Sequence, residues 1–431
     1  MKLTFLSQPL DNVLPPSQNS IGIWIYEVAR RLANNHQVSV YANGGRIPPK
    51  KKVIEGVTYK FFRAVPYRIT RDVATRLSRY TQPEKPPFSS WFYSFEYCLQ
   101  AALEMRRQGI EVVHIVNFSQ FIPIVRAFNP QAKIVIHMQC EWLSQLDRES
   151  IAGRISKSNL ILGCSDYITQ LIRDRFPEFA HLCRTVYNGV NETDFYPAGD
   201  GSRDECPPRL LFVSRLSPEK GVHILLRAFR QVVERYPSAE IELIGSPGAA
   251  PVEYIIRLSQ DEKIVSLLEF YKNGDYRDHL VAEIPASLKD QVIFSGHVKH
   301  DRVPDHYRMA DILINPSLSE PFGMALVEGM ASGIPVVAPR VGGMVEIIEH
   351  GECGYLVQND DVPDLANAII NLLDHPEIRK AMGQAGRKRV LELFTWDRIV
   401  DQLLTQYNVL FAGENTPVTF PTQPFSDNPT A

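Results

Sequence analysis

The sequence predicts an α/β protein with two doubly wound parallel sheets, each in its own lobe. Three observations favour this class. The chain has 431 residues, enough for two or three domains. Short apolar runs alternate with longer helical patterns, which is typical of right-handed βαβ units. The alternation forms two series separated by a stretch that carries Gly and Pro, so we expect two lobes.

The first series contains five runs, and most runs of the two series are apolar on both faces, as expected for strands that helices cover on both sides. The helical pattern Trp24–Ala33 follows the first of them. We therefore expect an N-terminal lobe over residues 1–197. Its predicted strands are Leu3–Ser7, Gln37–Tyr41, Val112–Val116, Lys133–His137 and Leu160–Cys164.

The second series predicts a lobe over residues 207–395, after a linker at Phe195–Pro208. Residues 247–290 stand where a short connection would suffice, and we expect an inserted helical excursion there. An amphipathic helix over 396–412 is expected to pack back on the first lobe, and residues 413–431, with four prolines, are expected to be disordered. The predicted strands are Arg209–Ser214, Glu240–Ile244, Val292–Ser295, Ile312–Asn315, Pro335–Ala338 and Gly354–Val357.

Composition places the chain among ordinary soluble globular proteins. Hydrophobic residues make up 44% and charged residues 22%, and the formal net charge of -3 gives nucleic acid no general attraction to the chain. The six cysteines show neither C-x-x-C nor His-flanked spacing, so we expect no disulfide framework, no zinc site and a reducing compartment. No apolar run approaches the roughly 18 residues of a membrane-spanning helix. We expect a cytoplasmic protein whose membrane contact, if any, is peripheral at the inner face.

One segment concentrates positive charge on the first lobe. Arg46–Lys85 holds eleven Lys or Arg residues against three acids, with aromatic residues among the cations. Such a segment suits an anionic bilayer or an anionic acceptor, such as a lipid-linked or phosphorylated glycan. The alternative is a solvated basic loop.

The most informative stretch runs from Asn315 to Glu328. A predicted strand ends at Asn315, a loop follows, and a helix begins near Phe322 or Gly323, so unpaired backbone N–H groups point above the sheet. Such a helix end attracts phosphate. Glu320 and Glu328 would be about 12 Å apart along a helical rise, which suits the two ends of one nucleotide diphosphate. The alternative is that Glu320 caps the helix and Glu328 is a solvated surface acid.

A second stretch, Val213–Gly221, follows the first strand of the second series. Ligands of open parallel sheets bind beyond the carboxyl ends of the strands, so we expect Arg215 and Lys220 to lie beside the acidic loop. A guanidinium fork and a point charge together suit a diphosphate and neutralise charge on a departing phosphate. The alternative is an ordinary basic loop in which Ser217 and Pro218 start the next helix.

Taken together and in this order, these motifs closely resemble those of the retaining glycosyltransferases of family four. The resemblance covers most of the chain. It implies the GT-B architecture of two Rossmann-like lobes facing a central cleft. It also implies an enzyme that moves a sugar from a nucleotide diphosphate-sugar to a hydroxyl of a glycan, lipid or small molecule. Further matches are Asn188–Asn191, Gly296–Val298, Val341–Gly343 and Thr395–Trp396.

Carried over position by position, the resemblance implies a role for each site residue. Arg215 and Lys220 match the cations that grip the donor diphosphate. Glu328 matches the acid that binds the ribose hydroxyls, and Glu320 matches the carboxylate at the transferred sugar. The remaining assignments are Phe322, Gly323 and Met324 near the sugar and phosphate, His297 and Val298 beside the base, Gly22 in a flexible glycine-rich loop, and His137 as the active-site histidine.

The sequence departs from the family pattern in three loops. Only Gly22 of the usual glycine pair is present, and Gly245–Gly248 replaces a loop that often contains Asp-Gly. The strand that ends at His137 continues as Met138–Trp142, which leaves the acceptor pocket undefined. A core histidine without a catalytic role is the alternative for His137.

The expected mechanism retains the anomeric configuration without a strong protein nucleophile, because spacing singles out no acid of the first lobe as a covalent partner. The departing phosphate would accept the proton of the incoming hydroxyl, while the protein supplies positioning and charge. We expect no obligatory metal or cofactor, since Asp360-Asp361 reads as a solvated loop.

Two other classes of function stay open. A sugar-nucleotide 2-epimerase of the same architecture would act without an acceptor, and a sugar phosphorylase would need orthophosphate. A non-catalytic sugar-nucleotide-binding protein would keep the fold and lose turnover, which the intact cations and acids argue against. A nicotinamide dehydrogenase is disfavoured because neither first βα turn carries G-x-G-x-x-G. The base, the sugar, the acceptor and the oligomeric state are left open.

Overall fold

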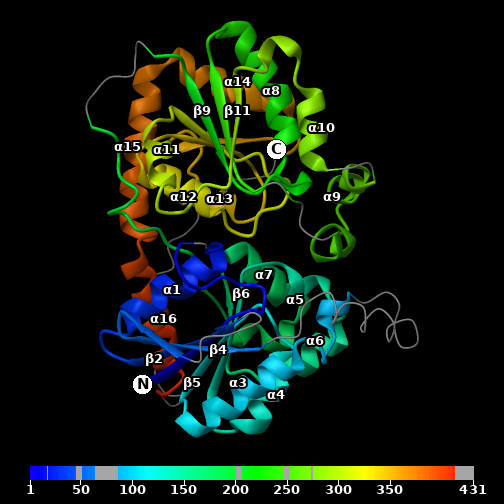
Figure 1. The fold of residues 1–431 in the computed structure, drawn as a ribbon, viewed down its shortest axis with the longest axis vertical. Coiled ribbons are helices and arrows are strands. Elements are labelled where there is room, and N and C mark those ends of the chain that lie inside the picture. Colours follow the sequence, from blue (N-terminus) through cyan, green and yellow to red (C-terminus); the bar gives the residue numbers. More distant parts are fainter. Residues whose placement is uncertain are drawn as a thin grey trace.

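The computed structural model has two lobes, one above the other, each built on one parallel sheet with helices on both faces (Figure 1). This confirms the predicted class. The structure describes residues 1–16, 18–44, 51–63, 86–199, 206–246, 248, 252–272 and 275–412. The first sheet ends at Thr185 and the second begins at Arg209, so the predicted linker lies within the segment between the two sheets.

The first lobe contains an eight-stranded sheet in the order β3-β4-β2-β1-β5-β6-β7-β8, in which only the β3–β4 pair is antiparallel. All five residues of β5 are buried, because helices cover both faces of the sheet. The strands are β1 (Lys2–Leu6), β2 (Gln37–Asn43), β3 (Lys51–Ile54), β4 (Val57–Phe62), β5 (Val112–Val116), β6 (Lys133–Met138), β7 (Leu160–Gly163) and β8 (Cys183–Thr185). The helices are α1 (Ser20–Leu32), α3 (Phe95–Gln108), α4 (Phe121–Phe128), α5 (Trp142–Gln145), α6 (Arg148–Ile155) and α7 (Asp166–Arg175).

All five predicted strands of this lobe are present, with ends shifted by at most two residues. Strands β3, β4 and β8 were not predicted. The first two lie inside the basic segment, where the edge strand β3 carries exposed lysines instead of an apolar run. Residues 46–50 and 64–85 of that segment lie outside the described residues.

The second lobe contains a six-stranded parallel sheet in the order β11-β10-β9-β12-β13-β14. Its strands are β9 (Arg209–Val213), β10 (Glu240–Ile244), β11 (Val292–Gly296), β12 (Ile312–Ile314), β13 (Val336–Pro339) and β14 (Gly354–Val357). Its helices are α8 (Val222–Arg235), α9 (Glu262–Ser266), α10 (Tyr276–Glu283), α11 (Val303–Arg308), α12 (Met324–Ala331), α13 (Met344–Ile347), α14 (Val362–Asp374) and α15 (Pro376–Leu393). All six predicted strands are present.

Helix α8 illustrates how the sequence sets an element of this lobe. Apolar side chains recur at spacings of three and four and are buried against the sheet, at Val222, Leu225, Leu226, Phe229 and Val232. Each such burial contributes about 1.5–3 kcal/mol. The helix does not start at Ser217 and Pro218. Those residues begin a separate 3₁₀ turn, Pro218–Lys220, which Gly221 ends with a φ of +68°.

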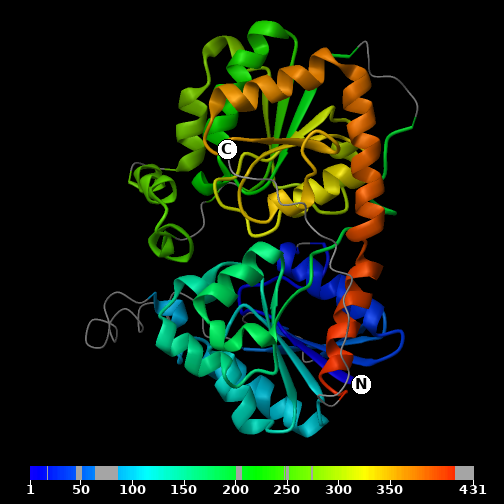
Figure 2. The ribbon, with the colours of Figure 1, turned by 180° about the vertical axis from the view of Figure 1, so that it is seen from behind.

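The chain crosses between the lobes twice, and the two crossings lie side by side. Val190 forms an isolated bridge with Thr395, and its N–H donates to the carbonyl of Phe394 at 2.9 Å. Immediately beyond, helix α16 (Trp396–Val409) leaves the second lobe and packs along α1 of the first (Figures 1 and 2). Buried Trp396 and Leu403 belong to the same apolar cluster as Trp24. The tail expected over 413–431 lies outside the described residues.

A second connection between the lobes comes from the inserted segment after β10. Its described part forms short helices, including a 3₁₀ turn at Val252–Tyr254 and α9, as the predicted excursion requires. The Trp142 indole N–H of the first lobe donates to the carbonyl of Tyr254 at 2.9 Å. Figure 1 shows α9 at the side of the second lobe, close to the first. Among the described helices, none is long and apolar enough to span a bilayer.

Candidate functional site

Lys220 and Glu320 form the centre of the candidate site. The Lys220 ammonium lies 2.8 Å from Oε2 of Glu320, and the two side chains are only 12% and 14% exposed. They meet because β9 and β12 are neighbouring parallel strands, so the loops at their carboxyl ends are adjacent. The N–H of Leu318 also donates to the carbonyl of Glu219 at 2.9 Å and ties the two loops together. The alternative that Glu320 caps the following helix is wrong, because no side chain caps α12.

Glycine at position 221 permits this approach of the two loops. A Cβ at Gly221 would lie 2.1 Å from the carbonyl oxygen of Pro316, and its φ of +68° is one that side chains rarely allow. Lys220 is thus held directly against the loop that follows β12.

Arg215 extends the positive charge at the end of β9. Its guanidinium lies 3.2 Å from Oε1 of Glu219, and its side chain is 48% exposed. Glu219 is buried and also accepts a hydrogen bond of 2.5 Å from Ser217. The buried carboxylate thus holds one end of a half-exposed cation at the carboxyl end of β9.

Glu328 lies on α12 and is buried, so it is not a solvated surface acid. The Tyr307 hydroxyl donates to its Oε2 at 2.9 Å, and the His300 Nε2 lies 3.5 Å from its Oε1. Burial alone would lower the pKa of His300, but the hydrogen bond and charge of Glu328 outweigh burial and raise it. The sequence patterns did not identify Tyr307 or His300, because neither residue lies within one of the motifs on which the resemblance rests.

The amino terminus of α12 lies between the two carboxylates. Gly323 is its N-cap residue, with φ +116°, and no side chain caps the helix. The N–H groups of the first turn are therefore available to an anion. Phe322 is buried and packs 6.0 Å from Tyr187 and 5.9 Å from Phe394, between ring centroids. Met324 is half-buried and packs against apolar clusters of both lobes.

The structure places His297 and Val298 directly after β11. His297 is exposed, and Val298 is half-buried. His300, which bonds Glu328, follows two residues later, so this loop and the buried carboxylate belong to the same part of the second lobe.

His137 lies inside the first lobe and its side chain is not exposed. Its Nδ1 is 3.2 Å from Nε2 of His114, whose Nδ1 is 2.7 Å from the Tyr407 hydroxyl on α16. Burial lowers the pKa of His137 to about 3 and the pKa of His114 well below its usual value. Strand β6 continues through Met138, and Gln139 is the half-buried residue that follows the strand, 3.2 Å from Nε2 of His137.

Gly22 lies in the first turn of α1 instead of in a loop. Its N–H donates to Oδ1 of Asn19, the N-cap residue, at 2.8 Å. The loop before it is held by Asp11, which accepts hydrogen bonds from Gln8 and Asn19. The described residues around Gly22 therefore form a capped helix start, unlike the flexible glycine-rich loop that the resemblance implied.

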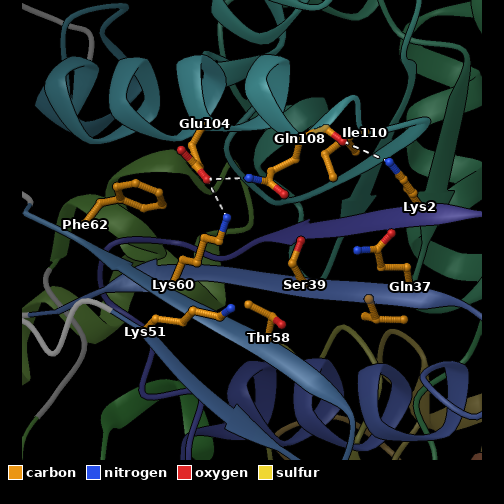
Figure 3. A pocket seen from close by; sticks show the side chains of 11 residues that line it. Lys2, Gln37, Ser39, Lys51, Thr58, Lys60, Phe62, Glu104, Gln108 and Ile110 are labelled. Carbon is orange, nitrogen blue, oxygen red and sulfur yellow. Dashed lines mark hydrogen bonds and ion pairs between the residues drawn. The ribbon is translucent and has the colours of Figure 1, made fainter.

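A cavity of the first lobe lies away from these groups (Figure 3). It has a volume of about 440 Å³ and is lined by Lys2, Lys51 and Lys60, among others. Lys60 is neutralised by Glu104 at 2.5 Å. The cavity borders the first residues of β1 and β2, the opposite end from that at which parallel sheets bind ligands.

Asp360 is exposed, and Asp361 has a structural role. The Asp361 carboxylate caps α14 by accepting a hydrogen bond from the N–H of Asp364 at 2.9 Å. In the parts of the chain that the structure describes, no three His, Cys, Asp or Glu residues gather as metal ligands would.

The chain thus has two doubly wound lobes, and cations and carboxylates lie at the strand ends of the second lobe. Residues 21–194 match the family described as Glycosyltransferase Family 4, and residues 200–389 match Glycosyl transferases group 1. These two matches cover most of the chain. The chain belongs to the group 1 glycosyltransferases of GT-B architecture, and it is an enzyme of that class.

Known proteins are similar over long stretches. Spore coat protein SA of Bacillus subtilis is 29% identical over 320 residues, which cover 70% of this chain and 80% of that protein. The D-inositol 3-phosphate glycosyltransferase of Thermobifida fusca is 27% identical, covering 93% of this chain and 91% of the relative. The solved structure of HepE from Anabaena in complex with UDP-glucose has a TM-score of 0.66 at 18% identity, covering 95% of this chain and all of HepE, and shows the same fold.

Proposed function

We propose that this glycosyltransferase binds a nucleoside diphosphate-sugar on its second lobe and transfers the sugar with retention of configuration. The observation that carries the proposal is the placement of Lys220, Glu320 and Glu328 around one uncapped helix start. Opposite charges meet at one end of that helix, and a buried acid lies on it. This arrangement suits a ligand with an anionic middle and hydroxyl groups on both sides.

The diphosphate replaces Glu320 as the partner of Lys220, with which Glu320 is paired in the free chain. When phosphate oxygens bind Lys220, the ion pair with Glu320 breaks. The Glu320 carboxylate then accepts hydrogen bonds from the hydroxyl groups of the sugar. Arg215 and the first-turn N–H groups of Gly323 and Met324 contact the remaining phosphate oxygens. Lys220, Arg215 and these N–H groups stabilise the negative charge that grows on the leaving diphosphate in the transition state.

Glu328 binds the ribose hydroxyls in this proposal. Its carboxylate is already oriented by Tyr307, so little side-chain entropy is lost when the ligand binds. The exposed loop at His297 and Val298 borders the base, because it continues into His300, which contacts Glu328.

The acceptor binds against the first lobe, beside Gln139. Asn188 donates to Oε1 of Gln139 at 2.8 Å, and the N–H of Gln139 donates to Asn117 at 2.6 Å, so its amide is held at a fixed position. His137 contacts the Gln139 amide and helps to position it, so its effect on the acceptor is indirect. In the retaining reaction the bond from sugar to phosphate breaks, the acceptor oxygen bonds the sugar carbon on the same face, and the acceptor proton passes to the phosphate.

A wider acceptor surface includes the basic segment, of which residues 51–63 are described. Contact of that segment with an anionic acceptor or with a membrane surface stays a prediction. We propose a cytoplasmic enzyme, without an obligatory metal, on the grounds given by its composition.

Thermal denaturation against UDP-, GDP- and ADP-sugars tests the proposal. UDP-glucose is the first ligand to try, because HepE binds it on the same fold. A selective donor at one hundred times its dissociation constant is expected to stabilise the chain by about 2.7 kcal/mol. The anomeric configuration of the transferred sugar, followed by NMR with the selected donor, is expected to match that of the donor. If no sugar nucleotide raises the melting temperature, the proposed function is wrong.

A further inference from the structure

Backbone N–H groups at the amino terminus of α7, in the first lobe, donate hydrogen bonds to a side chain of the second lobe. Glu346 on α13 accepts hydrogen bonds from the N–H groups of Asp166, at 2.7 Å, and Tyr167, at 2.6 Å. Both belong to the first turn, whose N–H groups have no partner within the helix. The N–H of Ile168 is taken by the Ser165 hydroxyl at 3.2 Å. Figure 1 shows α13 at the base of the upper lobe and α7 at the top of the lower one.

The same turn of the first lobe also holds the loop that carries Glu320. The Ser165 hydroxyl donates to the carbonyl of Pro321 at 2.7 Å. Ser319 donates to the carboxylate of Glu141, which also accepts a hydrogen bond of 3.0 Å from the Tyr167 hydroxyl. The residues before and after Glu320 are therefore each hydrogen-bonded to the first lobe.

The turn before α13 is packed against that loop from the other side. The N–H of Gly343 donates to the carbonyl of Glu320 at 3.0 Å. A Cβ at Gly342 would lie 2.1 Å from the same carbonyl oxygen, so the two backbones are in direct contact. A shift of α13 is thus passed directly to the backbone of Glu320.

We propose that Glu346, together with the turn Cys164–Tyr167, forms an interlobe clamp that positions Glu320 relative to the acceptor lobe. Glu346 is a positioning residue in this account, because it acts on Glu320 through backbone contacts. The inference rests on the proposed function, since it assigns the clamp to the sugar-transfer step. It explains why a carboxylate is kept buried between the lobes, where burial raises the pKa of Glu346 to about 7 although the two N–H groups lower it.

The substitution Glu346→Gln tests the clamp with little change in shape. An amide has one acceptor oxygen, and its NH₂ group faces the second N–H, so at least one of the two hydrogen bonds is lost. Amide hydrogen exchange of Asp166 and Tyr167 is expected to become at least tenfold faster in the ligand-free chain. With UDP-glucose, or with the donor that the panel selects, kcat for release of the nucleoside diphosphate is expected to fall at least tenfold while the donor KM stays within twofold.

Two further variants separate positioning from general damage. Ser165→Ala removes the hydrogen bond to Pro321 together with the cap on the N–H of Ile168, and it is expected to lower kcat in the same way, again with the donor KM unchanged. Glu269→Gln, on the inserted segment, removes only an exposed ion pair of 2.6 Å with Lys272, and both readouts are expected to stay at the wild-type level.

The outcomes are distinct. Unchanged exchange at Asp166 and Tyr167 in Glu346→Gln would show that the clamp does not exist in solution. Faster exchange with unchanged kcat, or equal losses of kcat and donor affinity, would overturn the positioning role. A failure of the proposed function appears earlier, as a wild-type chain that no sugar nucleotide stabilises, and the clamp then loses its role in transfer although the exchange result stands.

Discussion

Replacing Lys220 by alanine is expected to lower kcat for release of the nucleoside diphosphate by about 100- to 1,000-fold, the loss that follows removal of one preorganised group that stabilises developing charge. The ammonium is the half-buried cation closest to Glu320, at 2.8 Å, and it neutralises the leaving diphosphate in the proposed reaction. Without it, Glu320 faces the donor phosphates as an uncompensated negative charge. Steady-state kinetics with the selected donor measure the effect.

Lys272→Ala is the matched control for this substitution. Lys272 pairs with Glu269 at 2.6 Å on the surface of the inserted segment, and both side chains are more than half exposed. Exposed ion pairs of this kind contribute little to stability. The control is expected to keep wild-type rates. If the kcat of Lys220→Ala stays within threefold of wild type, the diphosphate does not bind at Lys220.

The substitution Glu328→Gln is expected to weaken nucleotide binding by about ten- to a hundredfold, because a charge-assisted hydrogen bond contributes about 1.5–3 kcal/mol and each 1.4 kcal/mol is a factor of ten. Glutamine keeps the length of the side chain and one acceptor for the Tyr307 hydroxyl. Isothermal titration with the nucleoside diphosphate measures the change in dissociation constant.

Tyr307→Phe distinguishes a binding role of Glu328 from a purely structural one. That variant removes the 2.9 Å hydrogen bond to the carboxylate and leaves the carboxylate itself in place. Nucleotide affinity is expected to fall by less than in Glu328→Gln. Equal losses in the two variants, or no loss in Glu328→Gln, would contradict a contact between Glu328 and the ligand.

Most of the parallel strands were predictable because they are short, largely apolar runs buried on both faces, as in β5 and β13. Strands at the edges of the first sheet were not predictable, since β3 places two exposed lysines where the pattern needs apolar residues, and β8 contains no aliphatic residue. The same physical rule explains both outcomes. Buried strands need apolar side chains, which can be recognised in the sequence. The pairing of edge strands depends on backbone hydrogen bonds, which nearly every residue type can form.

The meeting of Lys220 and Glu320 was also predictable, because both follow the carboxyl ends of parallel strands of one sheet. The partners of these residues were not. Glu346 is 180 residues from Asp166, and Tyr307 reaches Glu328 from another helix, so neither contact leaves a local pattern. The expectation for His137 placed it at the end of its strand, but β6 continues for one more residue and His137 is fully buried.

A structure of the chain with a bound nucleoside diphosphate locates the ligand directly. The account predicts phosphate oxygens within hydrogen-bonding distance of the Lys220 ammonium and of the first-turn N–H groups of α12, with the ribose hydroxyls on Glu328. A nucleotide bound in the lysine-lined cavity of the first lobe instead, with Lys220 still paired to Glu320, would contradict it.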